Sequence, residues 1–255
     1  MGARLGQHFL FDPAILGRIA DAALIGKGDH VLEIGPGQGP LTRELARRAA
    51  RVTAIETDAR LAAALAAQFA GSNVTIVHAD ALKTDWPRAY VIAGNIPYQI
   101  TSPLIERALA PPRPVRVVFL MQAEVADRLA AAPGAEAYGS LSAGVQLVAK
   151  VEKLFVVKAG SFRPPPKVQS ALIRLSPLAS RLVRDDAEEA ATRRLIQSAF
   201  QRRRQQIQRT LREAYDLTSD RALAVLEAAG IPPMERAERL SPVDFLTIAR
   251  LLATI

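Results

Sequence analysis

The feature that most constrains the fold of this chain is a regular alternation of short apolar runs with helix-like segments. Each of five apolar runs between residues 29 and 157 precedes turn-forming residues: His30–Ile34, Val52–Glu56, Asn73–Val77, Tyr90–Gly94 and Val115–Met121. Continuous apolar runs of this length are typical of strands that are buried on both faces of a parallel sheet. The Ala- and Leu-rich segments Asp58–Phe69 and Pro103–Ala110 are long enough for crossover helices. The pattern predicts an α/β fold.

The character of the chain changes near residue 177. Two further strand-like runs, Leu154–Val157 and Ser170–Ser176, close the α/β region and flank the proline cluster Pro164–Pro166. From Leu178 to Ile255 the sequence has helical periodicity with charged faces and no strand pattern. We therefore predict two domains, an α/β domain over residues 1–177 and a small all-helical domain over residues 178–255.

The charge of the chain points to a polyanionic partner. Thirty-three Lys and Arg residues stand against 25 Asp and Glu residues, which gives a net charge of +8. There is no cysteine, and the three histidines are isolated from one another, so we expect no disulfide and no bound metal. No stretch is apolar enough for a signal peptide or a membrane span, so the expected location is the cytoplasm.

A glycine-rich loop follows the first strong strand. Gly35, Gly37 and Gly39 lie between this strand and a helix, where glycines allow the backbone to approach a ligand closely. A dinucleotide fingerprint would need glycine at the position of Pro40, which disfavours a nicotinamide enzyme. The pattern from Glu33 to Gly39 instead resembles the first motif of class I methyltransferases.

Two acidic residues follow the next strands in register. Glu56 ends the second strand, where a carboxylate can accept hydrogen bonds from both hydroxyls of a ribose. Asp80 follows the third strand, where it can accept from the amino group of an adenine. Together with the glycine loop, these side chains predict a nucleoside site at the carboxyl edge of the sheet.

The tetrapeptide Asn95-Ile96-Pro97-Tyr98 follows the fourth strand. An exocyclic adenine amine is a poor nucleophile because its lone pair is delocalised into the ring. The side-chain oxygen of Asn95 and a main-chain carbonyl at Ile96 or Pro97 could both accept hydrogen bonds from such an amine. Tyr98 could stack on a base that has left its helix.

This tetrapeptide resembles the catalytic motif of the ribosomal RNA adenine N6,N6-dimethyltransferases. Further segments match the same family: GQHFL at 6–10, YGSLS at 138–142, FRPPPKVQS at 162–170, AFQRRR at 199–204 and ERLSPVDF at 238–245. The resemblance covers nearly the whole chain. It implies a Rossmann-like methyltransferase domain over residues 1–177, an RNA-binding helical domain over residues 178–255, and S-adenosylmethionine as the cofactor.

The resemblance also implies roles for single residues. The cofactor would contact His8, Leu10, Gly35, Gly37, Glu56, Asp80 and Asn95. Catalysis would rest on Asn95, Ile96, Pro97, Tyr98 and Phe162, with Tyr98 and Phe162 holding the target adenine between two aromatic faces. His8 stands where the family usually has asparagine, and Arg163 stands where many small-subunit enzymes have a second phenylalanine.

Two branches of the family are possible. The triple-proline loop resembles that of the small-subunit branch. That branch dimethylates two adjacent adenines of small-subunit (16S) ribosomal RNA during ribosome biogenesis. The other dimethylates a large-subunit (23S) adenine and confers macrolide resistance. A protein of this fold that binds nucleic acid without catalysis, as a ribosome assembly factor or a transcription factor of mitochondrial type, remains a third interpretation.

Basic side chains predict where RNA is bound. Lys167 lies in the proline loop, and Arg202, Arg203 and Arg204 open a stretch that has no acidic residue up to Arg212. We expect these side chains to contact phosphates, although a merely solvated helix face would have the same composition. The expected partner is small-subunit ribosomal RNA in a pre-ribosomal particle, bound by a monomer.

Overall fold

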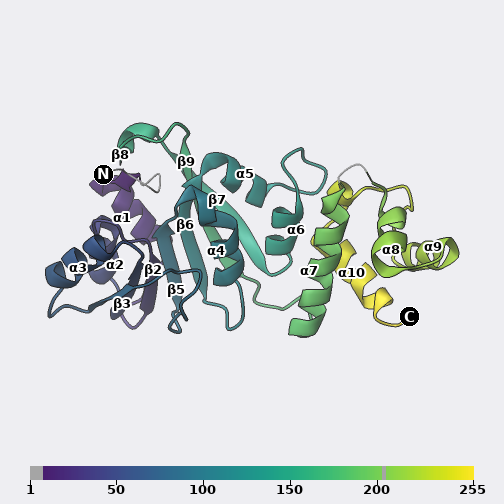
Figure 1. The fold of residues 1–255 in the computed structure, drawn as a ribbon, viewed down its shortest axis with the longest axis horizontal. Helices are drawn as coiled ribbons and strands as arrows, with labels where there is room; N and C mark the ends of the chain where they lie inside the picture. Colours follow the sequence, from purple (N-terminus) through teal and green to yellow (C-terminus); the bar gives the residue numbers. More distant parts are fainter. Residues whose placement is uncertain (1–7, 203–204) are drawn as a thin grey trace. The chain divides into compact units, whose positions relative to one another are not determined.

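A mixed β-sheet forms the centre of the first part of the molecule (Figure 1). The computed structural model describes residues 8–202 and 205–255. Within them the sheet has seven strands in the order β4-β3-β2-β5-β6-β9-β7. In chain order these strands are β2 (His30–Ile34), β3 (Arg51–Glu56), β4 (Val74–His78), β5 (Val91–Asn95), β6 (Arg116–Gln122), β7 (Ala149–Val157) and β9 (Ser170–Pro177).

The predicted strands are confirmed, with ends that move by about one residue. The largest difference is β7, which begins at Ala149 rather than at Leu154. Strands β2 to β6 run parallel, and β9 lies antiparallel to β6. A second sheet was not predicted: β1 (Phe9–Leu10) pairs antiparallel with β8 (Phe162–Arg163).

The strand order reverses between β2 and β5. The chain proceeds from β2 outward through β3 and β4, and then returns to place β5 on the other side of β2. The connections after β2 and β5 therefore leave the sheet in opposite directions and open a crevice at their carboxyl ends. The glycine loop follows β2, and the predicted catalytic tetrapeptide begins at the last residue of β5.

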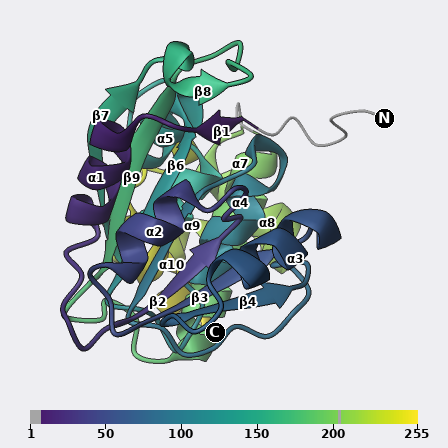
Figure 2. The same ribbon diagram turned by 90° about the vertical axis from the view of Figure 1, so that its left-hand side faces the viewer.

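Helices cover both faces of this sheet (Figure 2). Helices α1 (Pro13–Ala22) and α2 (Pro40–Ala46) pack on one face against a cluster that includes Val31, Val91 and Val118. The opposite side of the sheet carries α4 (Thr101–Ala108), whose Leu104 and Ile105 are fully buried. Helix α3 (Ala59–Gln68) contacts β3 and β4, and α5 (Ala123–Ala130) directly follows β6.

The structure separates into two compact units. The first comprises Val151–Pro177 together with the described residues up to Ala126, and the second comprises Asp127–Lys150 together with the described residues from Leu178 to Ile255. The predicted boundary after residue 177 is one of the points at which the chain passes from one unit to the other. Residues 127–150, which the prediction assigned to the α/β domain, belong to the helical unit instead.

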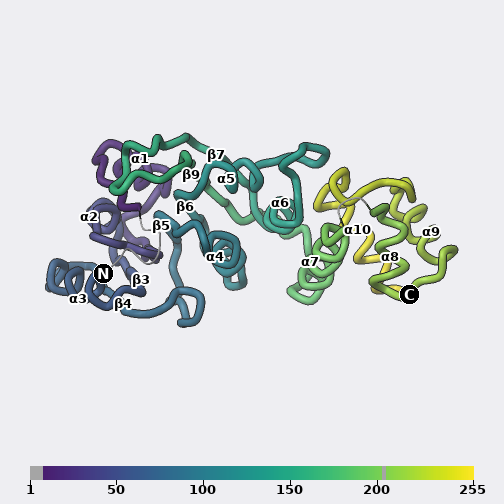
Figure 3. The backbone as a smooth tube through the Cα atoms, turned by 45° about the horizontal axis from the view of Figure 1, so that its top comes forward, coloured from purple at the N-terminus to yellow at the C-terminus, as the bar shows by residue number. Residues whose placement is uncertain are grey.

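The helical unit, whose helices are labelled in Figure 3, has its own apolar core. Its helices are α6 (Ser140–Gln146), α7 (Asp186–Gln201), α8 (Ile207–Tyr215), α9 (Ser219–Ala228) and α10 (Pro242–Leu252). Tyr138 lies in this core and donates a hydrogen bond from its hydroxyl to the carbonyl of Leu240 at 3.0 Å. This hydrogen bond, together with the packing of α6 against α7 and α10, joins residues 127–150 to the helical unit. None of the helices in the described part of the chain is long and apolar enough to cross a membrane.

Candidate functional site

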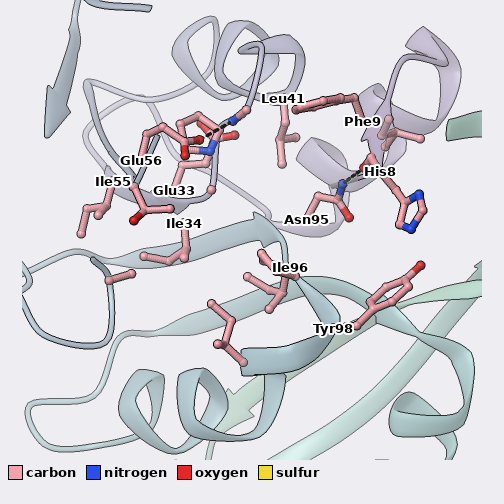
Figure 4. Close-up of a pocket in the computed structure, with 18 of the residues that line it drawn as sticks. His8, Phe9, Glu33, Ile34, Leu41, Ile55, Glu56, Asn95, Ile96 and Tyr98 are labelled. Carbon is pink, nitrogen blue, oxygen red and sulfur yellow. Dashed lines mark hydrogen bonds between the residues drawn. The ribbon is translucent and has the colours of Figure 1, made fainter. Parts of the chain in front are cut away.

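A pocket of about 280 Å³ lies at the carboxyl ends of β2, β3, β4 and β5 (Figure 4). It is close to the lower end of the range for small-molecule sites. All seven residues predicted to contact the cofactor line it, and so do three further residues of the predicted catalytic set. These residues are His8, Leu10, Gly35, Gly37, Glu56, Asp80, Asn95, Ile96, Pro97 and Tyr98.

The glycine loop and Glu56 form one wall of the pocket. The Glu56 side chain is buried, and its two carboxylate oxygens accept the main-chain N–H groups of Gly37 at 3.0 Å and of Asp58 at 2.9 Å. Gly37 has φ = 59°, and a Cβ atom there would lie 2.9 Å from the ring of Phe9. Only glycine therefore permits both the turn and the close approach of Phe9. The carboxylate is held in place before any ligand arrives.

Glu33 places a second carboxyl group in the same wall. Its side chain is buried within β2, and Oε2 has no hydrogen-bond partner in the described part of the chain. Burial raises the pKa of Glu33 from 4.5 to about 8; the charge of Glu56 adds to this shift, while the hydroxyl of Thr42 opposes it. The pocket thus contains a buried acid that is protonated at neutral pH and has an unused oxygen.

Asp80 lies in a turn after β4. Its Oδ1 accepts the N–H of Leu82 at 2.9 Å, and its main-chain carbonyl accepts the N–H groups of Lys83 and Thr84. Oδ2 lies 3.7 Å from Nζ of Lys83. The turn directs Ala79, Asp80 and Ala81 toward the pocket, on the far side from Asn95 along the sheet edge.

Asn95 is oriented by the N-terminal segment. Its Nδ2 donates to the main-chain carbonyl of His8 at 2.9 Å, which leaves Oδ1 available as an acceptor on the side that faces Tyr98 (Figure 4). A Cβ atom on the preceding Gly94 would lie 2.5 Å from the carbonyl oxygen of Ile34. Only glycine therefore fits there and lets β5 bring Asn95 beside the glycine loop.

Tyr98 lies beside His8 at the edge of the pocket. The two ring centroids are 5.8 Å apart, and the Tyr98 hydroxyl shares a hydrogen bond of 3.1 Å with Ser170 on β9. The His8 ring is held in turn by the carbonyl of Pro164, 2.7 Å from Nδ1. The N-terminal segment, the tetrapeptide and the proline loop are therefore connected around one aromatic ring.

Phe162 does not line the pocket. Its ring is 2% exposed and packs in the core cluster that also contains Leu10 and Leu120. The adjacent Arg163 lies with its guanidinium 4.4 Å from the ring centroid of Phe11. The predicted pair of aromatic faces is thus not formed in this arrangement, because the pairing of β8 with β1 directs Phe162 inward.

The predicted RNA contacts lie elsewhere on the chain. Lys167 is exposed in the proline loop. Arg202 is exposed as well, but it pairs with Glu213 at 2.5 Å, and Arg209 pairs with the same carboxylate at 2.7 Å. Glu213 follows the acid-free stretch by one residue, and its pKa is lowered by Arg209, Gln205 and Arg202. Arg203 and Arg204 lie outside the described residues.

Among the pocket residues to which sequence reasoning assigned no role, Phe9 and Glu33 matter most for the shape and charge of the wall. Phe9 packs over the glycine loop, and Glu33 supplies a buried carboxyl group. Glu33 did carry a signal, since a charged residue inside an otherwise apolar strand needs a reason to be buried. Phe9 was visible only as part of the motif GQHFL, and its contact with the glycine loop could not be predicted because it joins segments that are distant in the sequence.

Comparisons with known proteins agree with this geometry. The family model described as "Ribosomal RNA adenine dimethylase" matches residues 2–254. A "Ribosomal RNA small subunit methyltransferase A" of Xanthomonas campestris pv. campestris (strain B100) is 41% identical over 254 residues, covering 96% of this chain and 94% of that protein.

Two solved structures are similar over both units. A dimethyladenosine transferase from Plasmodium falciparum has a TM-score of 0.84 and 31% identity, covering 94% of this chain and 96% of the other. The 23S rRNA methyltransferase ErmE has a TM-score of 0.77 and 31% identity, covering 96% of this chain and 99% of the other.

Proposed function

Since this chain belongs to the ribosomal RNA adenine dimethylase family, we propose that it dimethylates the exocyclic amines of two adjacent adenosines in small-subunit (16S) ribosomal RNA. The observation that carries the proposal is the place of Asn95. This side chain lies at the end of β5 on the wall of a nucleoside-sized pocket, with its amide nitrogen already bonded to His8. An acceptor oxygen is therefore held where a target amine could meet a bound cofactor.

The pocket fits S-adenosylmethionine. Glu56 offers a buried carboxylate for the ribose hydroxyls, and Asp80 offers an acceptor for the adenine amino group. The unpartnered oxygen of Glu33 suits a hydrogen-bonding group of the cofactor. His8, Leu10, Gly35 and Gly37 would complete the contacts. When bound, the cofactor supplies a methyl group on a positively charged sulfur.

The residues of the tetrapeptide act on the target amine. Oδ1 of Asn95 and the main-chain carbonyl of Ile96 accept its two hydrogens, which favours a more pyramidal nitrogen with a localised lone pair. The carbonyl of Pro97 is less suited to this role, because it already accepts from the N–H of Ile100 and from the hydroxyl of Thr101. Proline limits the motion of the carbonyls. No strong general base is needed, because the positively charged product amine loses its proton readily. Tyr98 stacks on the flipped base, while a role for Phe162 requires its ring to leave the core.

The small-subunit branch is favoured by similarity. The relative at 41% identity carries the small-subunit name, whereas the 23S enzyme ErmE is 31% identical. The intact pocket disfavours a non-catalytic assembly factor. A protein that only binds RNA does not need a buried carboxylate, such as that of Glu56, that is held in place to bind a nucleoside. The substrate would be a pre-ribosomal particle in the cytoplasm, and the enzyme would act as a monomer.

The test is to map the modified nucleotides. Small subunits that lack adenine dimethylation are incubated with the protein and methyl-labelled cofactor, and the RNA is examined by primer extension and nucleoside mass spectrometry. We expect N6,N6-dimethyladenosine at two adjacent positions of 16S RNA. Labelling of 23S RNA alone would support the large-subunit branch, and cofactor binding without transfer to either RNA would support a binding factor.

A further inference from the structure

A single arginine holds the turn that carries Asp80. Arg107, in the last turn of α4, donates from Nη1 to the carbonyl of Leu82 at 2.6 Å and from Nη2 to the carbonyl of Thr84. Its guanidinium lies 5.0 Å from the ring centroid of Trp86. The indole of Trp86 donates to the carbonyl of Ala81 at 2.8 Å. Three carbonyls of one short turn are therefore bound by two side chains.

This turn forms part of the pocket on its other side. Asp80, Ala81 and Leu82 line the pocket, whereas Arg107 does not. Between Ala79 and Tyr90 the chain contains no helix and no strand. Main-chain bonds from Lys83 and Thr84 to the carbonyl of Asp80 close the turn itself. Arg107 adds two contacts from outside the pocket, which attach the turn to α4.

The other end of α4 is attached to the catalytic tetrapeptide. Thr101, the first residue of the helix, donates from its hydroxyl toward the carbonyls of Pro97 and Tyr98, at 3.2 Å and 3.3 Å. Thr101 is buried, as are Leu104, Ile105 and Ala108 along the helix. One packed helix thus joins the tetrapeptide at its start to the Asp80 turn at its end.

We propose that Arg107 is a positioning residue, which holds the Asp80 turn in the shape that binds the adenine of the cofactor. This inference rests on the proposed function, because it takes Asp80 to be the adenine contact. The planar fork of a guanidinium can serve two carbonyls and stack on an indole at once. Lysine has one ammonium group and cannot reproduce all three contacts.

Binding of S-adenosylhomocysteine tests the proposal. The variants are Arg107→Ala and Arg107→Lys, and Arg116→Ala is the matched control. Arg116 also donates to main-chain carbonyls, those of Ala23 and Leu24, but does not line the pocket or contact the Asp80 turn. By calorimetry, Arg107→Ala should raise the Kd about tenfold and Arg107→Lys by less, since hydrogen bonds from a charged donor are lost. Arg116→Ala should leave the Kd unchanged.

Two further readouts separate positioning from general stability. Hydrogen exchange without ligand should accelerate at the amides of Leu82, Lys83 and Thr84 in Arg107→Ala and not in Arg116→Ala. In a double-mutant cycle, Arg107→Ala should cost little affinity once Asp80→Ala is present, because the two residues act on one contact. At saturating cofactor the rate of methyl transfer should stay within about twofold of the wild type, so that the loss appears in KM and not in kcat.

The outcomes separate the proposed function from the role of Arg107. A wild-type protein that fails to bind S-adenosylhomocysteine overturns the proposed function. A wild-type protein that binds it, beside a folded Arg107→Ala that binds equally well, overturns the role of Arg107 alone. The role of Arg107 is also overturned if Arg107→Ala and Arg116→Ala lose equal affinity, or if the losses of affinity in Arg107→Ala and Asp80→Ala are fully additive. If Arg107→Ala does not fold, Arg107→Lys decides by the same criteria.

Discussion

The pocket and the arginines around Glu213 use charged side chains in opposite ways. In the pocket, Glu56 is 3% exposed and both of its oxygens are bound by main-chain N–H groups. The side chains of Arg202, at the end of α7, and Arg209, on α8, are each 66% exposed and share Glu213. A buried, preorganised group binds a ligand only in one fixed geometry. Exposed charges instead add separate contributions to the binding affinity, and salt screens them. Substitutions in the two regions should therefore differ in kind as well as in size.

The largest effect is expected at Asn95. Asn95→Ala should slow methyl transfer by about a hundredfold to a thousandfold, because an aligned transition-state hydrogen bond is worth about 2.7–4 kcal/mol. The measurement is the transfer rate at saturating cofactor. Asn73→Ala is the matched control, since Asn73 also donates to main-chain carbonyls but lies outside the pocket. An Asn95→Ala enzyme that reacts as fast as the control would refute the acceptor role.

A smaller effect is expected at Glu56. Glu56→Ala removes a buried charged acceptor worth about 1.5–3 kcal/mol, so the Kd for S-adenosylmethionine should rise roughly tenfold to a hundredfold. Calorimetry measures this change, with circular dichroism to confirm the fold. Glu44→Ala is the control, because Glu44 on α2 pairs with Arg47 and Arg48 just beyond the end of this helix and does not line the pocket. Similar affinities for the two variants would contradict the assignment of Glu56.

Glu33 should make stability depend on pH. The folded protein holds this proton up to about pH 8, whereas the unfolded chain loses it near 4.5, so the folded state binds more protons between these values. The free energy of unfolding should therefore fall as pH rises through this window, by up to about 1.4 kcal/mol per pH unit. Glu33→Gln should flatten the slope in urea titrations at several pH values. An unchanged slope would show that Glu33 is ionised in the folded protein.

Much of this pocket was predictable because its parts are local in sequence. Glycines, an acidic residue or the tetrapeptide Asn-Ile-Pro-Tyr directly follow a strand in each case. In a parallel sheet, residues that directly follow a strand lie at the carboxyl edge of the sheet. Contacts between distant segments have no such signature. The pairing of β1 with β8 turns Phe162 into the core, and Arg107 reaches Leu82 across 25 residues.

The domain boundary illustrates the same limit. Residues 127–150 follow β6 as a crossover helix would, so their local pattern agrees with an α/β domain. Tyr138 nevertheless bonds to Leu240, and this contact across 102 residues places the segment in the helical core. The pairing of Glu213 with Arg202 and Arg209 could likewise not be predicted from the acid-free stretch alone.

The smallest effects are expected at Arg202 and Arg209. Replacing Arg202 and Arg209 with alanine should reduce the slope of log affinity against log salt by roughly two units, if both contact phosphates. Glu213→Gln should strengthen binding slightly, because it releases both guanidinium groups from an ion pair. Binding to small-subunit particles is measured by filter retention at several salt concentrations. An unchanged slope in the double variant would indicate a solvated face.

The central claim is that the chemistry belongs to the pocket and not to the basic surface. Single-turnover methyl transfer, with particle and cofactor both saturating, tests it most directly when Asn95→Ala and the Arg202/Arg209 double-alanine variant are measured together. We predict that Asn95→Ala binds the particle normally and transfers at least about a hundredfold more slowly. The arginine variant should need more particle to saturate and then transfer at the wild-type rate. A normal rate in Asn95→Ala, or a slow rate in the saturated arginine variant, would contradict the account.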